Sequence, residues 1–223
     1  MKTLKRHSWP ALAAVSALAV TSCASEPASP PKDRLCSVPA GSAEEQLLHT
    51  VIRTNTFRTE SAQPRDQRFV ERMEENLHNI GDPAATYTVS GCSYVPNGQA
   101  DTGRAAIDFE WVPLDEVKKE PTEKGTREYR LNGATGNTND VTTNLYVQCV
   151  MPGDLKEASK KVLLHTDAAF TVNLGPVHDH HTQDQQMAFV YRMTRRATEV
   201  LGCQNKPLTK DPVVEPLTES TSS

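Results

Sequence analysis

Four cysteines at nearly equal intervals constrain this chain more than any other feature. Cys36 and Cys92 are 56 residues apart, and Cys149 and Cys203 are 54 residues apart. In an exported chain, an even number of cysteines is typical of disulfides. A structural zinc site is the alternative, but such sites usually contain a Cys-x2-Cys pair, which these spacings lack. We therefore expect two disulfides.

Three segment matches, found in the same order in both halves of the chain, indicate an internal duplication. They pair Cys36–Pro39 with Cys149–Pro152, Leu47–Thr50 with Leu163–Thr166, and Phe69–Met73 with Phe189–Met193. Four cysteines allow three pairings, and sequence alone does not choose among them. The duplication favours one of these pairings, because a module that once folded alone would form a disulfide between its own two cysteines. It predicts Cys36–Cys92 and Cys149–Cys203.

The apolar pattern predicts an α+β fold with two related modules, each of antiparallel strands packed by one main helix. Apolar positions recur with helical period in residues 65–80 and 183–201, and Gly81 and Gly202 follow as expected helix ends. Strands are predicted at 86–94, 105–112, 127–131, 144–151 and 161–173. Residues 116–124 and 132–140 are expected to form loops.

The N-terminus has the pattern of an export signal. Three basic residues open the chain, and the apolar stretch 9–20 is too short to span a bilayer. Val20-Thr-Ser-Cys23 follows, and it resembles the lipobox of bacterial lipoproteins of the actinobacterial type. In that family the cysteine carries a diacylglyceryl group and a dedicated peptidase cleaves before it. The resemblance implies lipidation of Cys23 and a location on the extracytoplasmic face of the cell membrane. The alternative is a plain secretory signal with an unmodified thiol.

These patterns divide the chain into five segments. They are a signal peptide (1–22), a Pro/Ser-rich tether (23–34), a first module (35–140), a second module (141–205) and a disordered tail (206–223). In polyproline II form the tether would reach roughly 30 Å from the membrane. The tail has three prolines and ends Glu-Ser-Thr-Ser-Ser, a composition that does not bury enough apolar surface to order itself.

Charge limits the expected partners. Cleavage before Cys23 removes three basic residues and no acid, so the net charge falls from −4 to −7. A net acidic chain argues against nucleic acid or an anionic lipid surface as the partner. No later stretch reaches 18 consecutive apolar residues, so no transmembrane helix is expected. The expected partners are the membrane, through the lipid anchor, and a cell-wall component or another protein.

Histidines supply the densest cluster of metal-capable side chains, His178-Asp179-His180-His181. Imidazoles with a carboxylate are competent to bind Zn or Cu. However, adjacent residues of an extended loop point in different directions, so we expect a polar loop, no metal site and no cofactor. His49 and His165 occupy matching positions in the two Leu-Leu-His-Thr segments, and we expect them to share a packing role.

Catalytic signatures are missing from the sequence. There is no G-x-S-x-G, no H-E-x-x-H, no P-loop and no G-x-G-x-x-G pattern. A glycoside hydrolase would need paired carboxylates in a cleft, and sequence alone does not place Asp108 or Glu110 in one. We therefore predict no catalytic residues and a non-enzymatic binding or interaction module, anchored in the membrane at the cell surface. The alternatives are a metal-binding lipoprotein that uses His178–His181, or a cell-wall hydrolase.

Overall fold

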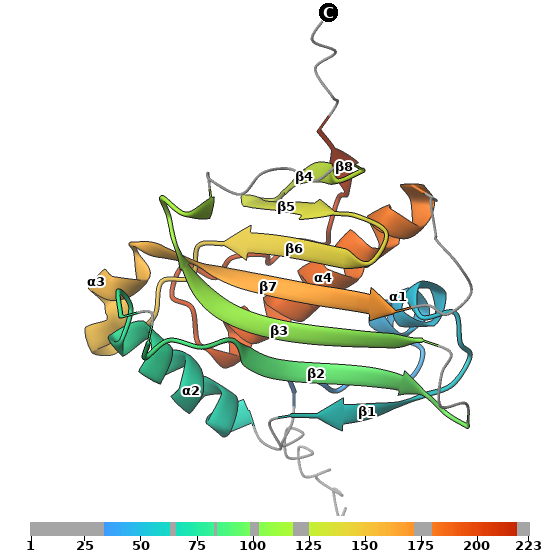
Figure 1. Cartoon of the computed structure of the whole chain (residues 1–223), viewed down its shortest axis with the longest axis horizontal. Helices are drawn as coiled ribbons and strands as arrows, with labels where there is room; N and C mark the ends of the chain where they lie inside the picture. Colours follow the sequence, from blue (N-terminus) through green and yellow to red (C-terminus); the bar gives the residue numbers. More distant parts are fainter. Residues whose placement is uncertain are drawn as a thin grey trace, which may run out of the picture. The chain divides into compact units, whose positions relative to one another are not determined.

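A single antiparallel sheet of eight strands runs through the computed structural model, which describes residues 34–62, 66–82, 84–98, 103–117, 125–171 and 180–217. The strands are β1 (Phe57–Ser61), β2 (Val89–Pro96), β3 (Arg104–Pro113), β4 (Arg127–Leu131), β5 (Ala134–Thr138), β6 (Thr142–Val147), β7 (Val162–Thr171) and β8 (Glu215–Pro216). Their order in the sheet is β1-β2-β3-β7-β6-β5-β4-β8 (Figure 1). The predicted α+β class and all five predicted strands are confirmed, but the loop expected at 132–140 contains β5, which pairs with β4 and β6.

The helices are α1 (Ala43–Val51), α2 (Asp66–His78), α3 (Lys156–Ser159) and α4 (His180–Val200), with a 3-10 turn at Gly153–Leu155. The two predicted helices are confirmed as α2 and α4. Helix α1 was not predicted, although its N-terminus carries a capping signal. The Ser42 hydroxyl accepts from the Glu45 amide, and the Glu45 carboxylate accepts from the Gly41 amide. This reciprocal pattern is what Ser-x-x-Glu predicts at a helix start.

The structure does not show a duplicated module. Leu47–Thr50 lies in α1, whereas the matching Leu163–Thr166 lies in β7. In addition, β7 from the second half pairs along its whole length with β3 from the first half. The predicted boundary at 140/141 therefore falls inside one sheet, because the ladder between β3 and β7 joins the halves. The two short sequence matches took different local structures, since the tertiary partners of each segment differ. An ancestral duplication stays a prediction.

The three longer helices pack on one face of the sheet. Phe109 of β3 lies opposite Thr166 of β7, so both side chains point to the same face. Phe109 makes an edge-to-face contact with Phe69 of α2, and Thr166 bonds to Thr194 of α4. α1 reaches this face through α4, since Glu44 pairs with Arg192 and Arg196 (Figure 1). Strand residues between these positions point the other way, to a face that we call the open face.

Two glycines allow close packing within this layer. A Cβ at Gly136 of β5 would collide with the Asn144 carbonyl and touch Met187 of α4, so α4 lies directly against the strand backbone. Gly91 lies where the pairing of β2 with β3 shifts register, and a Cβ there would come within 2.6 Å of the Phe109 ring. A larger residue at Gly136 would push Met187 of α4 away from the sheet, and one at Gly91 would displace the Phe109 ring.

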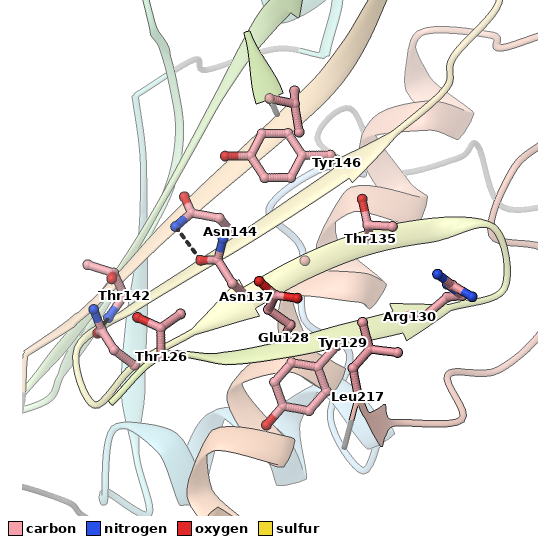
Figure 2. A pocket seen from close by; sticks show the side chains of 13 residues that line it. Thr126, Glu128, Tyr129, Arg130, Thr135, Asn137, Thr142, Asn144, Tyr146 and Leu217 are labelled. Atoms are coloured by element: carbon pink, nitrogen blue, oxygen red, sulfur yellow. Dashed lines mark hydrogen bonds between the residues drawn. The ribbon is translucent and has the colours of Figure 1, made fainter. Parts of the chain in front are cut away.

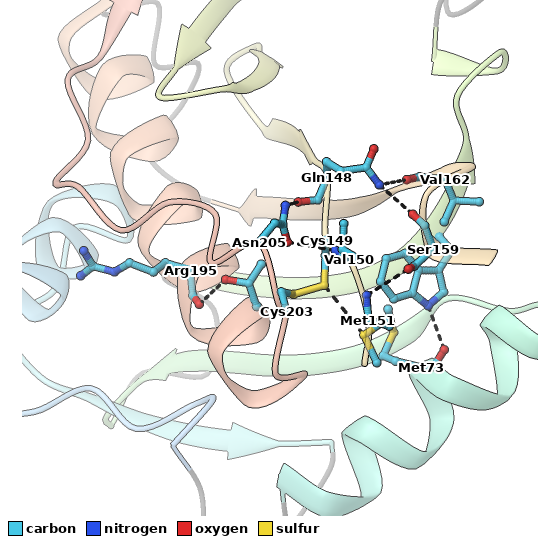
Figure 3. The surroundings of a disulfide bond; sticks show 12 residues. Met73, Gln148, Cys149, Val150, Met151, Ser159, Val162, Arg195, Cys203 and Asn205 are labelled. Atoms are coloured by element: carbon cyan, nitrogen blue, oxygen red, sulfur yellow. Dashed lines mark hydrogen bonds between the residues drawn. A yellow bond between two sulfur atoms is a disulfide. The ribbon is translucent and has the colours of Figure 1, made fainter. Parts of the chain in front are cut away.

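The structure joins Cys36 to Cys92 and Cys149 to Cys203, which is the pairing that the sequence predicts. The second bridge follows directly from how α4 ends (Figure 3). Gly202 adopts a left-handed φ of 71°, its amide bonds to the Glu199 carbonyl, and the Cys203 amide bonds to the Thr198 carbonyl. This Schellman motif turns the chain back over the helix and brings Cys203 to Cys149.

The prediction of a disordered tail is wrong for residues 206–217. Leu208 is 3% exposed and belongs to the hydrophobic core. β8 pairs with β4, and Asp211 accepts ion pairs from Arg192 and Arg195 of α4. The buried leucine, the two-residue ladder and the polar contacts of Lys210 and Asp211 with α4 together hold this Pro-rich segment against the rest of the fold.

Several predictions fall outside the described residues. These are the signal peptide, residues 23–33 of the tether with Cys23, and residues 118–124 and 218–223. Among the residues that the structure does describe, no helix is both long enough and apolar enough to cross a bilayer.

Candidate functional site

Polar side chains form two rows across the open face. Each row takes one residue from each of five neighbouring strands, and the two rows lie two residues apart along every strand. In the first row Asp108, Asp167, Asn144, Asn137 and Glu128 lie side by side on β3, β7, β6, β5 and β4. Residues in direct cross-strand register have side chains close enough to interact. The face that carries no described helix is therefore lined by hydrogen-bonding groups from five consecutive strands of the sheet.

The second row carries the most connected group on this face. It consists of Glu110, His165, Tyr146, Thr135 and Arg130, again on β3, β7, β6, β5 and β4. His165 stacks on Tyr146, with ring centroids 4.4 Å apart and planes 7° from parallel. Both rings are nearly buried, at 7% and 4% exposed. The stack therefore holds the imidazole in a fixed orientation in the middle of the sheet.

Both ring nitrogens of His165 face oxygen atoms. Nδ1 is 2.8 Å from Oε1 of Glu110, and Nε2 is 2.9 Å from Oδ1 of Asn144. The chain of contacts continues at each end. Thr88 donates to the second carboxylate oxygen of Glu110 at 3.0 Å, and Asn144 Nδ2 donates to Asn137 Oδ1 at 3.1 Å. A continuous hydrogen-bonded relay thus runs from Thr88, which directly precedes β2, across β3, β7, β6 and β5.

Two carboxylates beside the ring have shifted pKa values of opposite sign. The hydrogen bond from His165 lowers the pKa of Glu110, although burial opposes it. Burial raises the pKa of Asp167, and the nearby charges of Asp108 and Glu110 raise it further while His165 lowers it. Asp108 and Asp167 face each other in register, which is unfavourable for like charges. The contact with His165 therefore stabilises the charged form of Glu110, whereas burial and the neighbouring acids disfavour the charged form of Asp167.

A pocket of about 580 Å³ lies over β4, β5 and β6 at the end of this relay (Figure 2). Its walls are mainly hydroxyl and amide side chains, with one acid, one base and two aliphatic residues: Thr126, Thr135, Thr142, Asn137, Asn139, Asn144, Tyr146, Glu128, Arg130, Val117 and Leu217. Figure 2 shows Asn144 and Asn137 turned toward each other, with Thr135 and Arg130 farther along. The volume falls in the range of small-ligand sites, but the lining is more polar than is usual for them.

β4, which carries one wall of the pocket, is held in place from the helix-covered face. The Tyr129 hydroxyl donates to Asp184 of α4 at 2.8 Å, and Arg127 bonds to the same carboxylate oxygen at 3.3 Å. Burial and the neighbouring carboxylate raise the pKa of Tyr129 well above its ordinary value, so the phenol keeps its proton. The strand therefore has little freedom to move when a ligand enters.

A smaller hollow of about 160 Å³ lies at the other end of the relay. Its lining includes Tyr87, Thr88, Glu110 and Trp111. Trp111 is fixed by a bond from its indole nitrogen to the Met73 carbonyl of α2. Glu110 thus joins the buried ring to a solvent-accessible hollow, since its side chain is 37% exposed whereas that of His165 is 8% exposed.

His178 and Asp179 of the histidine cluster lie outside the described residues, whereas His180 and His181 begin α4 and are not part of the expected polar loop. His178 is not described, nor is the side chain of His180, and His181 is exposed and contacts Gln185. Within the described ranges, no three histidine, cysteine, aspartate or glutamate residues are grouped to hold a metal ion. The sequence matches predicted one shared packing role for His49 and His165. His49 has such a role, edge-on to Phe57, whereas His165 makes polar contacts through both ring nitrogens.

The relay was not predicted from the sequence, although part of its signal is present there. Asp108 and Glu110 alternate with large apolar residues, and His165 and Asp167 are likewise separated by a single residue. What the sequence lacks is the pairing of β3 with β7, which sets these four side chains side by side.

Comparison with known proteins finds no matching family model, no matching curated protein and no matching solved structure.

Proposed function

We propose that this protein is a non-enzymatic binding module, held on the extracytoplasmic face of the cell membrane by a lipid at Cys23, with its ligand site in the open-face pocket. The observation that carries the proposal is the pocket itself: side chains of three strands wall a space of about 580 Å³ on the face that lacks a described helix. Loose surface side chains would not hold such a shape, whereas strands fixed in one sheet do.

The lining favours an uncharged ligand rich in hydroxyl and amide groups. Glu128 and Arg130 supply one charge of each sign, so a phosphate or a polyacid would meet no net positive field. Val117 and Leu217 are the two aliphatic lining residues, too few to bury an acyl chain. Asn and Thr side chains both donate and accept, which suits vicinal hydroxyls and acetamido groups. Cell-wall glycans carry these groups.

The geometry of His165 supports binding over catalysis. A general base needs a nitrogen within hydrogen-bond reach of the proton that it removes. Each nitrogen of His165 is instead occupied by a neighbouring side chain, Glu110 or Asn144. The two disulfides also support an oxidising location outside the cytoplasm.

Titration with neutral trisaccharides tests the ligand site. The mature chain would be titrated with the trimer of N-acetylglucosamine and with maltotriose, monitored by amide chemical shifts. We expect shifts in residues of β4, β5 and β6 and a loss of affinity of about 2- to 10-fold in Asn137→Ala, the value of one hydrogen bond. Thr171→Ala is the matched control, because Thr171 is exposed on β7 and outside the pocket. Equal effects of both variants, or no shifts in these strands, would refute the site.

Membrane fractionation tests the anchor separately. Cys23→Ser should move the protein from the membrane fraction to the soluble exported fraction, since two or more acyl chains are needed for lasting attachment. Mass analysis of the wild-type protein should show an N-terminal cysteine with added lipid. An unmodified N-terminal cysteine would contradict the anchor without bearing on the pocket.

A further inference from the structure

Hydrogen-bond counting assigns a protonation state to His165. The carboxylate of Glu110 has only acceptor atoms when it is ionised, and its lowered pKa keeps it so. Oδ1 of Asn144 is also an acceptor, because Nδ2 of the same amide donates to Asn137. With the amides in these orientations, both ring nitrogens of His165 face acceptor atoms. Such an arrangement suits the doubly protonated imidazolium.

The same counting shows what loss of one proton requires. Nδ1 keeps its hydrogen for Glu110, so Nε2 becomes an acceptor that faces the Asn144 oxygen. Two lone pairs at hydrogen-bond distance repel, and rotation of the Asn144 amide by half a turn removes the conflict by placing its NH2 against the ring. The Asn144 oxygen then faces Asn137, whose amide must also rotate to donate. Both amides line the pocket.

We propose that protonation of His165 selects the orientation of the Asn144–Asn137 amide pair and thereby decides what Asn137 offers to a ligand. With the imidazolium, Asn137 turns its NH2 group into the pocket as a donor. With the neutral ring, it turns its carbonyl oxygen there as an acceptor. This inference rests on the proposed function of the pocket as a ligand site, and it makes His165 a positioning residue that acts through two amides.

Three carboxylates lie on the strands around the ring. Glu110 on β3 contacts it, Asp167 lies two residues along β7, and Asp108 on β3 faces Asp167 in register. Tyr146 on β6 covers the ring face, and Thr88, just before β2, contributes its neutral hydroxyl to Glu110.

Nitrogen NMR of the free protein tests the relay without any ligand. We would record the ring nitrogens of His165 and the side-chain amides of Asn137 and Asn144 between about pH 5 and about pH 8, the range in which histidine changes charge. We expect two protonated nitrogens at the acidic end and the Nδ1–H tautomer at the other, with both amides shifting along the same titration curve. An Nε2–H tautomer at high pH, or amides that ignore the titration, would overturn the inference.

Ligand pH dependence provides the second readout. An acetamido carbonyl only accepts, so a trimer of N-acetylglucosamine that places this carbonyl on Asn137 should bind on the order of tenfold more weakly at the alkaline end. Maltotriose has hydroxyls that rotate to donate or accept, and its affinity should stay within about twofold. In Glu110→Gln the new amide can either donate to Nδ1 or accept from it, so the group at this position no longer selects the tautomer of the neutral ring. The pH dependence of trimer binding should then be weaker than in the wild-type protein.

Failure of the two proposals can be told apart. If neither sugar binds at any pH, the proposed ligand class fails while the NMR titration still decides the relay. If the trimer binds equally at both pH values in the wild-type protein, the relay does not control the pocket and the inference is wrong.

Discussion

The two faces of the sheet use the same strands for opposite purposes. On the helix-covered face, β3 contributes Ile107, Phe109 and Trp111, all buried, and the last two contact α2. On the open face, the alternate residues Asp108 and Glu110 join the polar rows. One face is stabilised by apolar area removed from water, and the other depends on matched donors and acceptors. A strand with period two can therefore carry the core and the site together without either disturbing the other.

This contrast between the faces predicts the greatest loss of stability at the centre of the helix-covered face. Phe109→Ala should lower the free energy of unfolding by about 3–5 kcal/mol, because the ring leaves a cavity against Phe69. Asp108→Ala, one residue away on the open face, is the control and should change it by less than about 1 kcal/mol. Urea denaturation measures both. Similar losses in the two variants would mean that the open face contributes to the core.

Removal of the second disulfide should have the next largest effect. Cys149→Ala combined with Cys203→Ala opens a loop of 54 residues, and we expect a loss of about 2–4 kcal/mol. The matched variant lacks the Cys36–Cys92 bridge, whose loop spans 56 residues. Thermal denaturation of both would show whether the bridges stabilise equally, as chain entropy predicts. A loss confined to one bridge would show that the surrounding packing, and not the length of the loop, sets its value.

Acid should weaken the open face through Glu110. Its pKa is lower in the folded chain than its ordinary value of 4.5. Ionised Glu110 therefore stabilises the fold above that pH, and the contribution is lost as the pH falls through the folded-state value. At neutral pH Glu110→Gln should cost about 1 kcal/mol or less, since the group is partly exposed. The difference from wild type should shrink below about pH 4; a difference that is constant with pH would contradict the ion-pair account.

Asp167 should give the weakest effect, with the opposite sign. Its pKa is raised above the ordinary value of 3.8, so its ionisation costs stability as the pH rises from that value through the folded-state one. Asp167→Asn removes this cost and should raise the free energy of unfolding at neutral pH by less than about 1 kcal/mol. Below about pH 3.5 the gain should vanish. Destabilisation at neutral pH would show that the carboxylate has a favourable role on this face.

Individual helices and strands, and the disulfides, are the features that the amino-acid sequence predicts without knowledge of the tertiary structure. Helical period indicates α2 and α4, alternation indicates β3, and the spacing of four cysteines under a duplication leads to the observed bridges. These signals are local or covalent, so they do not depend on which strand lies beside which. The Ser42 and Glu45 capping pattern at α1 is equally local, and reading it would have added the helix that was not predicted.

The order of the strands and the site, by contrast, depend on tertiary structure. The pairing of β3 with β7 brings Glu110 to His165 across 55 positions of sequence, and the pairing of β7 with β6 adds Asn144. No short-range pattern encodes such neighbours, because strand order follows from the burial of all apolar faces at once. The same dependence on partners turned Leu47–Thr50 into helix and Leu163–Thr166 into strand, and it fixed Leu208 of a Pro-rich tail in the core.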